Sequence, residues 1–181
     1  GVDLSRGGQA TFDRIESLPE TVVAGIDGYC LGGGMELSMA ADLRVASDRS
    51  EFGQTEHNLG LMPGWGGTQR LPRIVGETRA TEIIFTADRY DPETLESYGF
   101  LNDVVPGEEL ETAATKLAAD LARGPPVAQR ATKRAMRAGR DDFGAGLEAA
   151  AQAFGHLFGT DDLMEGVTAF MSDEEPEFEG S

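Results

Sequence analysis

The sequence is poor in several residue types, and each shortage excludes a class of protein. Among its 181 residues there is one cysteine, Cys30, so an intrachain disulfide is excluded and a reducing cytoplasm is favoured. The two histidines, His57 and His156, are too few for a Cys/His zinc cluster, and we expect no metal site. No apolar run is long enough to cross a bilayer. The sequence therefore predicts a cytoplasmic protein without membrane segments.

Lysine is also scarce, and the charge is strongly negative. Lys116 and Lys133 are the only lysines, and the net charge is −17, from 32 acidic and 15 basic residues. Such a charge keeps a protein soluble but repels itself in the compact state, and salt screens that repulsion. We hypothesise a halophilic source; the alternative is an ordinary acidic cytosolic protein. The charge also argues against nucleic-acid binding, which requires a basic face.

What is present indicates a globular α/β chain, with hydrophobic residues making up 40%. Residues 21–26 form a short β-branched run typical of a buried strand, and Asp27-Gly28 is a turn signal. Three glycines, 32–34, precede a short helix over 35–41, and a second strand follows over 42–46. This close alternation of strands, glycine turn and helix predicts an α/β layered fold.

The second half predicts mainly helices. Apolar residues recur at helical spacing in four sets: Ala80, Ile83, Ile84, Ala87; Leu110, Ala113, Ala114, Leu117, Leu121; Leu147, Ala150, Ala151, Phe154, Leu157, Phe158; and Leu163, Val167, Phe170, Met171. Residues 101–105 predict a lone strand, and Pro125-Pro126 the start of a helix. We expect a core over 1–105, a helical oligomerisation segment over 106–172 and a poorly ordered acidic tail over 173–181.

The candidate chemistry centres on the glycine run. A glycine run between a strand and a helix presents backbone N–H groups at an open helix start, where they stabilise a phosphate or an oxyanion; a plain packing turn is the alternative. Glu36 lies in the first turn of that helix, and Glu56 lies before a glycine-rich loop over 60–67. Two carboxylates in one pocket perturb each other's ionisation, which suits proton transfer at neutral pH. Taken singly, each glutamate would be interpreted as a surface residue.

At this point the residues resemble the crotonase (enoyl-CoA hydratase/isomerase) superfamily. The matching segments are IDGYCLGGGMEL over 26–37, FGQTE over 52–56, LGLMPG over 59–64, GGTQRL over 66–71 and GVTAF over 166–170. The resemblance implies a crotonase-like (ClpP/crotonase) fold, a ββα spiral followed by a C-terminal helical trimerisation segment. It also implies that further ββα turns precede Gly1 in the family, so that the chain lacks an N-terminal part.

The resemblance further implies an oxyanion hole and an acid–base pair. The backbone N–H groups of Gly33 and Val2 would hold the thioester oxygen, with Gly1-Val2-Asp3-Leu4 forming the second loop of the hole. Glu56 would give a proton to the α-carbon and Glu36 would activate the water. Further substrate and coenzyme A contacts fall at Gly1, Asp3, Leu4, Leu31, Gly32, Thr55 and Gly60.

These features lead us to expect an enoyl-CoA hydratase of fatty-acid breakdown. We expect an acyl-CoA substrate, no cofactor beyond the coenzyme A of the substrate, and a homotrimer or hexamer. The alternatives are another crotonase-fold reaction, such as isomerisation, hydrolysis or decarboxylation, and a noncatalytic scaffold. Two features depart from the family pattern. His57 replaces an aliphatic residue, and an acidic tail follows Phe170 where basic residues usually meet the coenzyme A phosphates; Arg6 is the candidate replacement.

Overall fold

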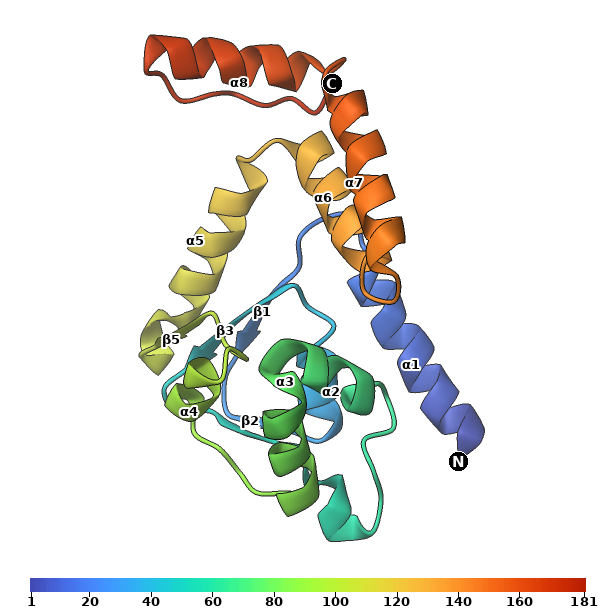
Figure 1. The fold of residues 1–181 in the computed structure, drawn as a ribbon. Helices are drawn as coiled ribbons and strands as arrows, with labels where there is room; N and C mark the ends of the chain where they lie inside the picture. The colour runs from blue at the N-terminus through green and yellow to red at the C-terminus, as the bar shows by residue number, and fades with distance from the viewer. The chain divides into compact units, whose positions relative to one another are not determined.

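The computed structural model describes residues 1–181 and divides into two compact units, which we describe separately (Figure 1). The core unit comprises Gly1–Leu18 and Val22–Leu117. The helical unit comprises Pro19–Thr21 and Ala118–Ser181. The division falls inside helix α5 (Leu110–Ala122).

The core unit is built from a repeated strand–strand–helix pattern. Three strands form a parallel sheet in the order β1-β3-β5, namely β1 (Val23–Ile26), β3 (Leu43–Ser47) and β5 (Asp103–Val105). A second parallel pair joins β2 (Tyr29–Leu31) to β4 (Glu51–Gly53). Each of the first two turns places one strand in each sheet and then continues into a helix, α2 (Gly33–Ser38) or α3 (Gly67–Thr86). This is the ββα arrangement that the family resemblance implies.

The apolar core lies where these helices meet the sheets. Met35 of α2, Phe52 of β4, and Leu71 and Ile83 of α3 are completely buried there. Arg44 of β3 is also buried, and its guanidinium donates to the carbonyl oxygens of Ser38, Ala41 and Phe100. A cation is favourable at the carbonyl end of a helix, and Arg44 therefore fixes the end of α2, the helix that carries Glu36.

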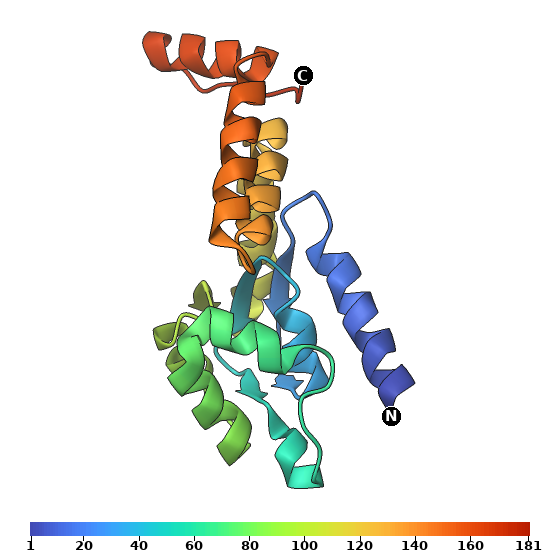
Figure 2. The same ribbon diagram turned by 45° about the vertical axis from the view of Figure 1, so that its right-hand side comes forward.

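Helix α1 (Val2–Glu16) is an element that the sequence analysis did not foresee. Residues 1–4 were expected to form a loop, but the helix already begins at Val2, with Gly1 as its N-cap. Its two glycines and its mainly exposed surface hide the helical pattern, because only Phe12 and Glu16 are buried. Figures 1 and 2 show α1 beside the loop that leads into α3.

Several other local features of the core unit were not predicted from the sequence. Gly76, with φ 80° and ψ 158°, divides α3 into two helical segments. Between β4 and α3 the chain forms a 3-10 helix, η1 (Thr55–Leu59). Further along the chain, two short elements precede α5: the helix α4 (Pro92–Ser97) and the 3-10 turn η2 (Gly107–Glu109). Pro92 stands at the first position of α4, where proline is well tolerated.

The helical unit contains α6 (Pro126–Ala138), α7 (Phe143–Leu157) and α8 (Asp161–Ser172). Helices α6 and α7 lie side by side in both views (Figures 1 and 2), and α7 and α8 are capped by the side chains of Asp142 and Thr160. Many apolar side chains of this unit are exposed, among them Phe143, Leu147, Phe154, Phe158, Met164, Phe170 and Met171. No helix of the chain has both the length and the apolar character needed to cross a membrane.

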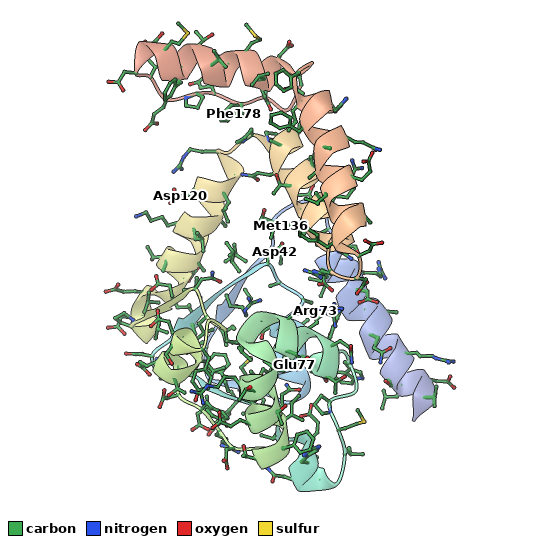
Figure 3. All side chains as sticks on the ribbon, viewed as in Figure 1. Asp42, Arg73, Glu77, Asp120, Met136 and Phe178 are labelled. Carbon is green, nitrogen blue, oxygen red and sulfur yellow. The ribbon has the colours of Figure 1, made fainter.

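The acidic tail was expected to be poorly ordered, but it makes defined contacts. It has no regular secondary structure and runs back along α8. The N–H groups of Glu179 and Gly180 donate to Asp162, and that of Glu177 donates to Glu165. Phe178 packs beside α8 at Gly166 (Figure 3). Backbone bonds to acidic side chains of the first turns of α8 hold the tail despite its charge.

Candidate active site

A cavity of about 740 Å³ lies within the core unit, between α1, α2, η1, the loop over 61–66 and the start of α3. Glu36 and Glu56 both line it, together with Gly33. The two carboxylates are 20 positions apart in the sequence, and they reach the same cavity because β2 and β4, the strands that precede them, are parallel neighbours with Leu31 opposite Gly53. Their surroundings differ, and these surroundings decide what each can do.

Glu36 is held rigidly at the wall of the cavity. The residue is 2% exposed, and its Oε1 accepts hydrogen bonds from the backbone N–H groups of Trp65, at 2.7 Å, and Gly67, at 2.8 Å. Both donors belong to the loop and first turn that open α3. With Oε1 occupied by the main chain, the other oxygen of Glu36 is left to meet a ligand or water.

Glu56 has a different environment. It stands in η1, and its carboxylate packs against Gly32, where an added Cβ would lie 3.3 Å from Oε1. Its Oε2 is buried without a hydrogen-bond partner. Burial raises the pKa of Glu56, the charge of Glu36 adds to that effect, and the backbone N–H of Glu56 and the neighbouring His57 oppose it. The environment therefore favours the protonated, proton-donating form.

The glycine turn beside Glu56 has the geometry of a close-approach site. Gly32 has φ 52° and ψ −121°, a conformation that suits glycine, and it is the N-cap of α2. The Gln54 side chain is completely buried and donates from Nε2 to the carbonyl oxygen of Gly32, which fixes the turn. Gly33 is the first helical residue, so its N–H lacks an acceptor within the helix.

The second expected oxyanion donor, Val2, is the first residue of α1. Its N–H likewise precedes the intrahelical bonds, the first of which joins the Ser5 N–H to the carbonyl oxygen of Gly1. The Val2 side chain is 65% exposed and does not line the cavity, whereas Gly1 and Leu4 do. The start of α1 therefore reaches the cavity through its backbone and through Leu4.

The remaining predicted contacts are not gathered at the cavity wall. Asp3 is exposed on the first turn of α1, and Leu31 ends β2 opposite Gly53. Thr55 begins η1, and Gly60 ends it with φ 70°. Arg6 is exposed on α1. His57 is also exposed, with its ring against Phe85 at 5.4 Å.

Trp65 is a further residue of the site, and it was not among the predicted contacts. It lines the cavity, and its indole fills the space beside two glycines. A Cβ added to Gly8 of α1 would lie 2.2 Å from the indole Cδ1, and one added to Gly33 would lie 2.4 Å from Cζ3. The ring also meets Phe12 edge-on, with centroids 5.8 Å apart. Trp65 thus joins α1 to the glycine turn of α2.

Sequence reasoning did not assign a role to Gln54 or Arg70 either. Both stand inside the motif segments that carry the resemblance, and both are buried polar residues. A polar residue inside a glycine-rich motif is the one signal that could have drawn attention to them, because buried polar groups need specific partners.

Comparison with solved structures confirms the expected crotonase-like fold class. An enoyl-CoA hydratase from Bacillus anthracis superimposes with a TM-score of 0.94 at 39% identity, over 98% of this chain and 69% of that one. A model of the enoyl-CoA hydratase/isomerase family matches residues 3–181. The chain belongs to the enoyl-CoA hydratase/isomerase family.

Two curated relatives are similar to this chain over most of its length. A crotonyl-CoA hydratase from Syntrophomonas wolfei is 40% identical over 172 residues, which cover 94% of this chain and 66% of the relative. A short-chain-enoyl-CoA hydratase from Clostridium acetobutylicum is 39% identical over 165 residues, which cover 91% of this chain and 63% of the relative. The chain thus spans just under two thirds of the length of these relatives.

Proposed function

We propose that this chain carries the acid–base centre of an enzyme that adds water to a trans-2-enoyl-CoA and forms the 3-hydroxyacyl-CoA, as in fatty-acid β-oxidation. The observation that carries the proposal is that two glutamates with different environments share one cavity. The membership of the family and the relatives named as hydratases of crotonyl-CoA and short-chain enoyl-CoA support the choice of substrate.

In the proposed reaction, Glu36 and Glu56 have different roles. Glu36 holds a water molecule with the carboxylate oxygen that the loop leaves free and takes its proton as the oxygen attacks the β-carbon. Glu56, whose raised pKa favours the neutral acid, delivers a proton to the α-carbon. One hydrogen and one hydroxyl are added across the double bond, so no oxidant is needed, and we propose that no metal or redox cofactor takes part.

The thioester oxygen gains negative charge during this attack. We place it at the N–H groups of Gly33 and Val2, the first helical residues of α2 and α1. Each preorganised donor of this kind typically contributes about 3 kcal/mol in the transition state. The proposed coenzyme A and substrate contacts at Gly1, Asp3, Leu4, Leu31, Gly32, Thr55 and Gly60 complete the site.

The test is hydration of crotonyl-CoA by the protein and by Glu36→Gln and Glu56→Gln. Each variant is expected to lose about 10²–10⁴-fold in kcat, because an amide can neither accept the proton of water nor donate an acidic one. Glu77→Gln is the matched control, since Glu77 is exposed on α3 and outside the cavity (Figure 3). Wild-type rates in both cavity variants would refute the acid–base assignment. Double-bond migration without water addition would select an isomerase, and RNA retention without turnover a noncatalytic role.

We also propose the assembly and setting. The exposed apolar faces of α7 and α8, with Phe170 88% exposed, support a homotrimer or a hexamer in which copies of this chain cover one another. The net charge of −17 and the scarcity of lysine support a halophilic source, and the single buried cysteine supports a cytoplasmic location.

A further inference from the structure

Part of the cavity wall is a charged cluster that the proposed reaction does not use, made of Asp13, Glu16 and Arg70. Arg70, on the first turn of α3, is 9% exposed. Its Nε and Nη2 donate to Glu16 Oε2 at 3.0 and 2.9 Å, and Nη2 also donates to Asp13 Oδ1 at 2.5 Å. Both acidic residues lie in the last part of α1, so one guanidinium holds the end of that helix.

The same guanidinium holds the loop that supports Glu36. Arg70 Nη1 donates to the carbonyl oxygen of Trp65 at 3.0 Å. It passes so close under Gly66 that a Cβ there would lie 2.0 Å from Nη1, and Gly66 has φ 117°. The peptide groups on either side of this contact supply the two N–H donors to Glu36 Oε1.

Other contacts between α1 and this loop reinforce the link. Ser5 Oγ and Gln9 Nε2 both donate to the carbonyl oxygen of Gly64, at 2.6 and 2.9 Å, and the Trp65 indole packs on Gly8. The loop is therefore joined to α1 at several points, and the guanidinium of Arg70 donates hydrogen bonds to both. A planar guanidinium with several fixed donors suits such a three-way contact.

We propose that Arg70 is a positioning residue, which fixes the loop over 65–67 against α1 and thereby sets Glu36 relative to the helix start that carries Val2. Arg70 lines the cavity, and we assign its effect to the peptide groups that bind Glu36 Oε1 rather than to contact with the reacting atoms. We call the contacts of Arg70 with α1 and with the Trp65 carbonyl the clamp. The expected kinetic effect rests on the proposed function, whereas the effect of the clamp on the position of the loop does not.

Arg70→Lys tests the clamp while keeping the charge. A lysine ammonium is a point donor and can reach the carboxylates of α1 or the Trp65 carbonyl, but it cannot hold both. We expect kcat for crotonyl-CoA hydration to fall about 10- to 100-fold, as small displacements of a catalytic group do, while KM changes little. Glu16→Gln, which weakens the contact of Arg70 with α1 and keeps its contact with the Trp65 carbonyl, is expected to lower kcat by a smaller factor.

A double variant separates positioning from general loosening. If Arg70 acts through Glu36, adding Arg70→Lys to Glu36→Gln changes kcat by less than about twofold, whereas independent effects multiply. Leu95→Ala is the stability control, because Leu95 is completely buried in the core unit and its helix α4 does not line the cavity. It is expected to lower the unfolding midpoint and leave kcat unchanged.

Trp65 is the only tryptophan, so its fluorescence reports on the loop without turnover. Arg70→Lys is expected to shift its emission, and Leu95→Ala is expected not to do so while the protein is folded. The inference is overturned if Arg70→Lys leaves the emission unchanged. It is also overturned if Arg70→Lys lowers kcat by the same factor in the wild type and in Glu36→Gln. If the wild-type protein does not hydrate crotonyl-CoA, the proposed function is refuted instead. The fluorescence emission of Arg70→Lys then tests by itself whether Arg70 holds the loop.

Discussion

Two adjacent glycines in α1, Gly7 and Gly8, should respond oppositely to the same substitution. Glycine inside a helix ordinarily costs about 0.5–1 kcal/mol relative to alanine. A Cβ at Gly7 meets nothing within 4 Å, so Gly7→Ala should raise the free energy of unfolding by about that amount. At Gly8 the new Cβ would lie 2.2 Å from Trp65 Cδ1.

The magnitude at Gly8 follows from the contact distance. Carbon atoms pack at about 3.5–4.0 Å, so the indole or α1 would have to move by more than about 1 Å. Overpacking of this kind costs about 1–3 kcal/mol, and the gain in helix propensity offsets only part of it. We expect Gly8→Ala to lower the free energy of unfolding by about 1–2 kcal/mol, the opposite sign to Gly7→Ala.

Urea unfolding followed by helical circular dichroism measures both effects, and Trp65→Ala supplies the control. Without the indole, Gly8→Ala should become stabilising, as Gly7→Ala is. The reasoning fails if the two alanine variants shift the unfolding free energy in the same direction, or if the effect of Gly8→Ala is the same with and without the indole. Either result would mean that the indole does not occupy the space beside α1.

Three further measurements address other features. Burial raises the pKa of Glu56 above the usual 4.5, so the proton that Glu56 holds stabilises the folded state at low pH, and this contribution is lost as the pH rises above 4.5. The stability of Glu56→Gln relative to the wild type should therefore increase as the pH rises from 4, and a difference that stays constant with pH would contradict the shift. The net charge of −17 predicts an unfolding free energy that rises from low to molar KCl, and equal stability would refute the halophilic hypothesis. Burial raises the pKa of Cys30 to about 11, so a thiol reagent at neutral pH should label Cys30 only after unfolding, and rapid labelling of the folded protein would contradict its burial.

The fold could be predicted where its signals are local. The β-branched run around β1, the short strand pattern of β3 and the helical periodicity of α3, α5, α7 and α8 are visible in the sequence. Strands β2 and β4 are three residues each, too short for any alternation to stand out. Helix α1 is mostly exposed and contains two glycines, so its stability comes from contacts with the distant 64–70 segment, which no local pattern records.

The candidate site divides in the same way. Glu36, Glu56 and Gly33 stand next to a glycine run and could be singled out by residue type and resemblance, and the structure places all three at one cavity. Arg70 could not, because its partner Glu16 is 54 residues away and an Arg–Glu pair leaves no spacing rule in the sequence. The orientation of α1 and of the loop, on which the geometry of the cavity depends, follows from such long-range contacts.

The glycines of the loop that opens α3 are better explained by space than by flexibility. A Cβ on Gly67 would lie 2.5 Å from Gln54 Oε1 and 3.1 Å from Glu36 Oε1, and a Cβ on Gly66 would collide with Arg70. The absence of a Cβ at Gly67 therefore leaves room for the side chains of Gln54 and Glu36, and its absence at Gly66 leaves room for Arg70, which joins the loop to α1. A side chain at Gly67 would push directly on the oxygen that the main chain holds. The glycine-rich segment that opens α3 is thus tightly packed, and the fixed position of Glu36 depends on it.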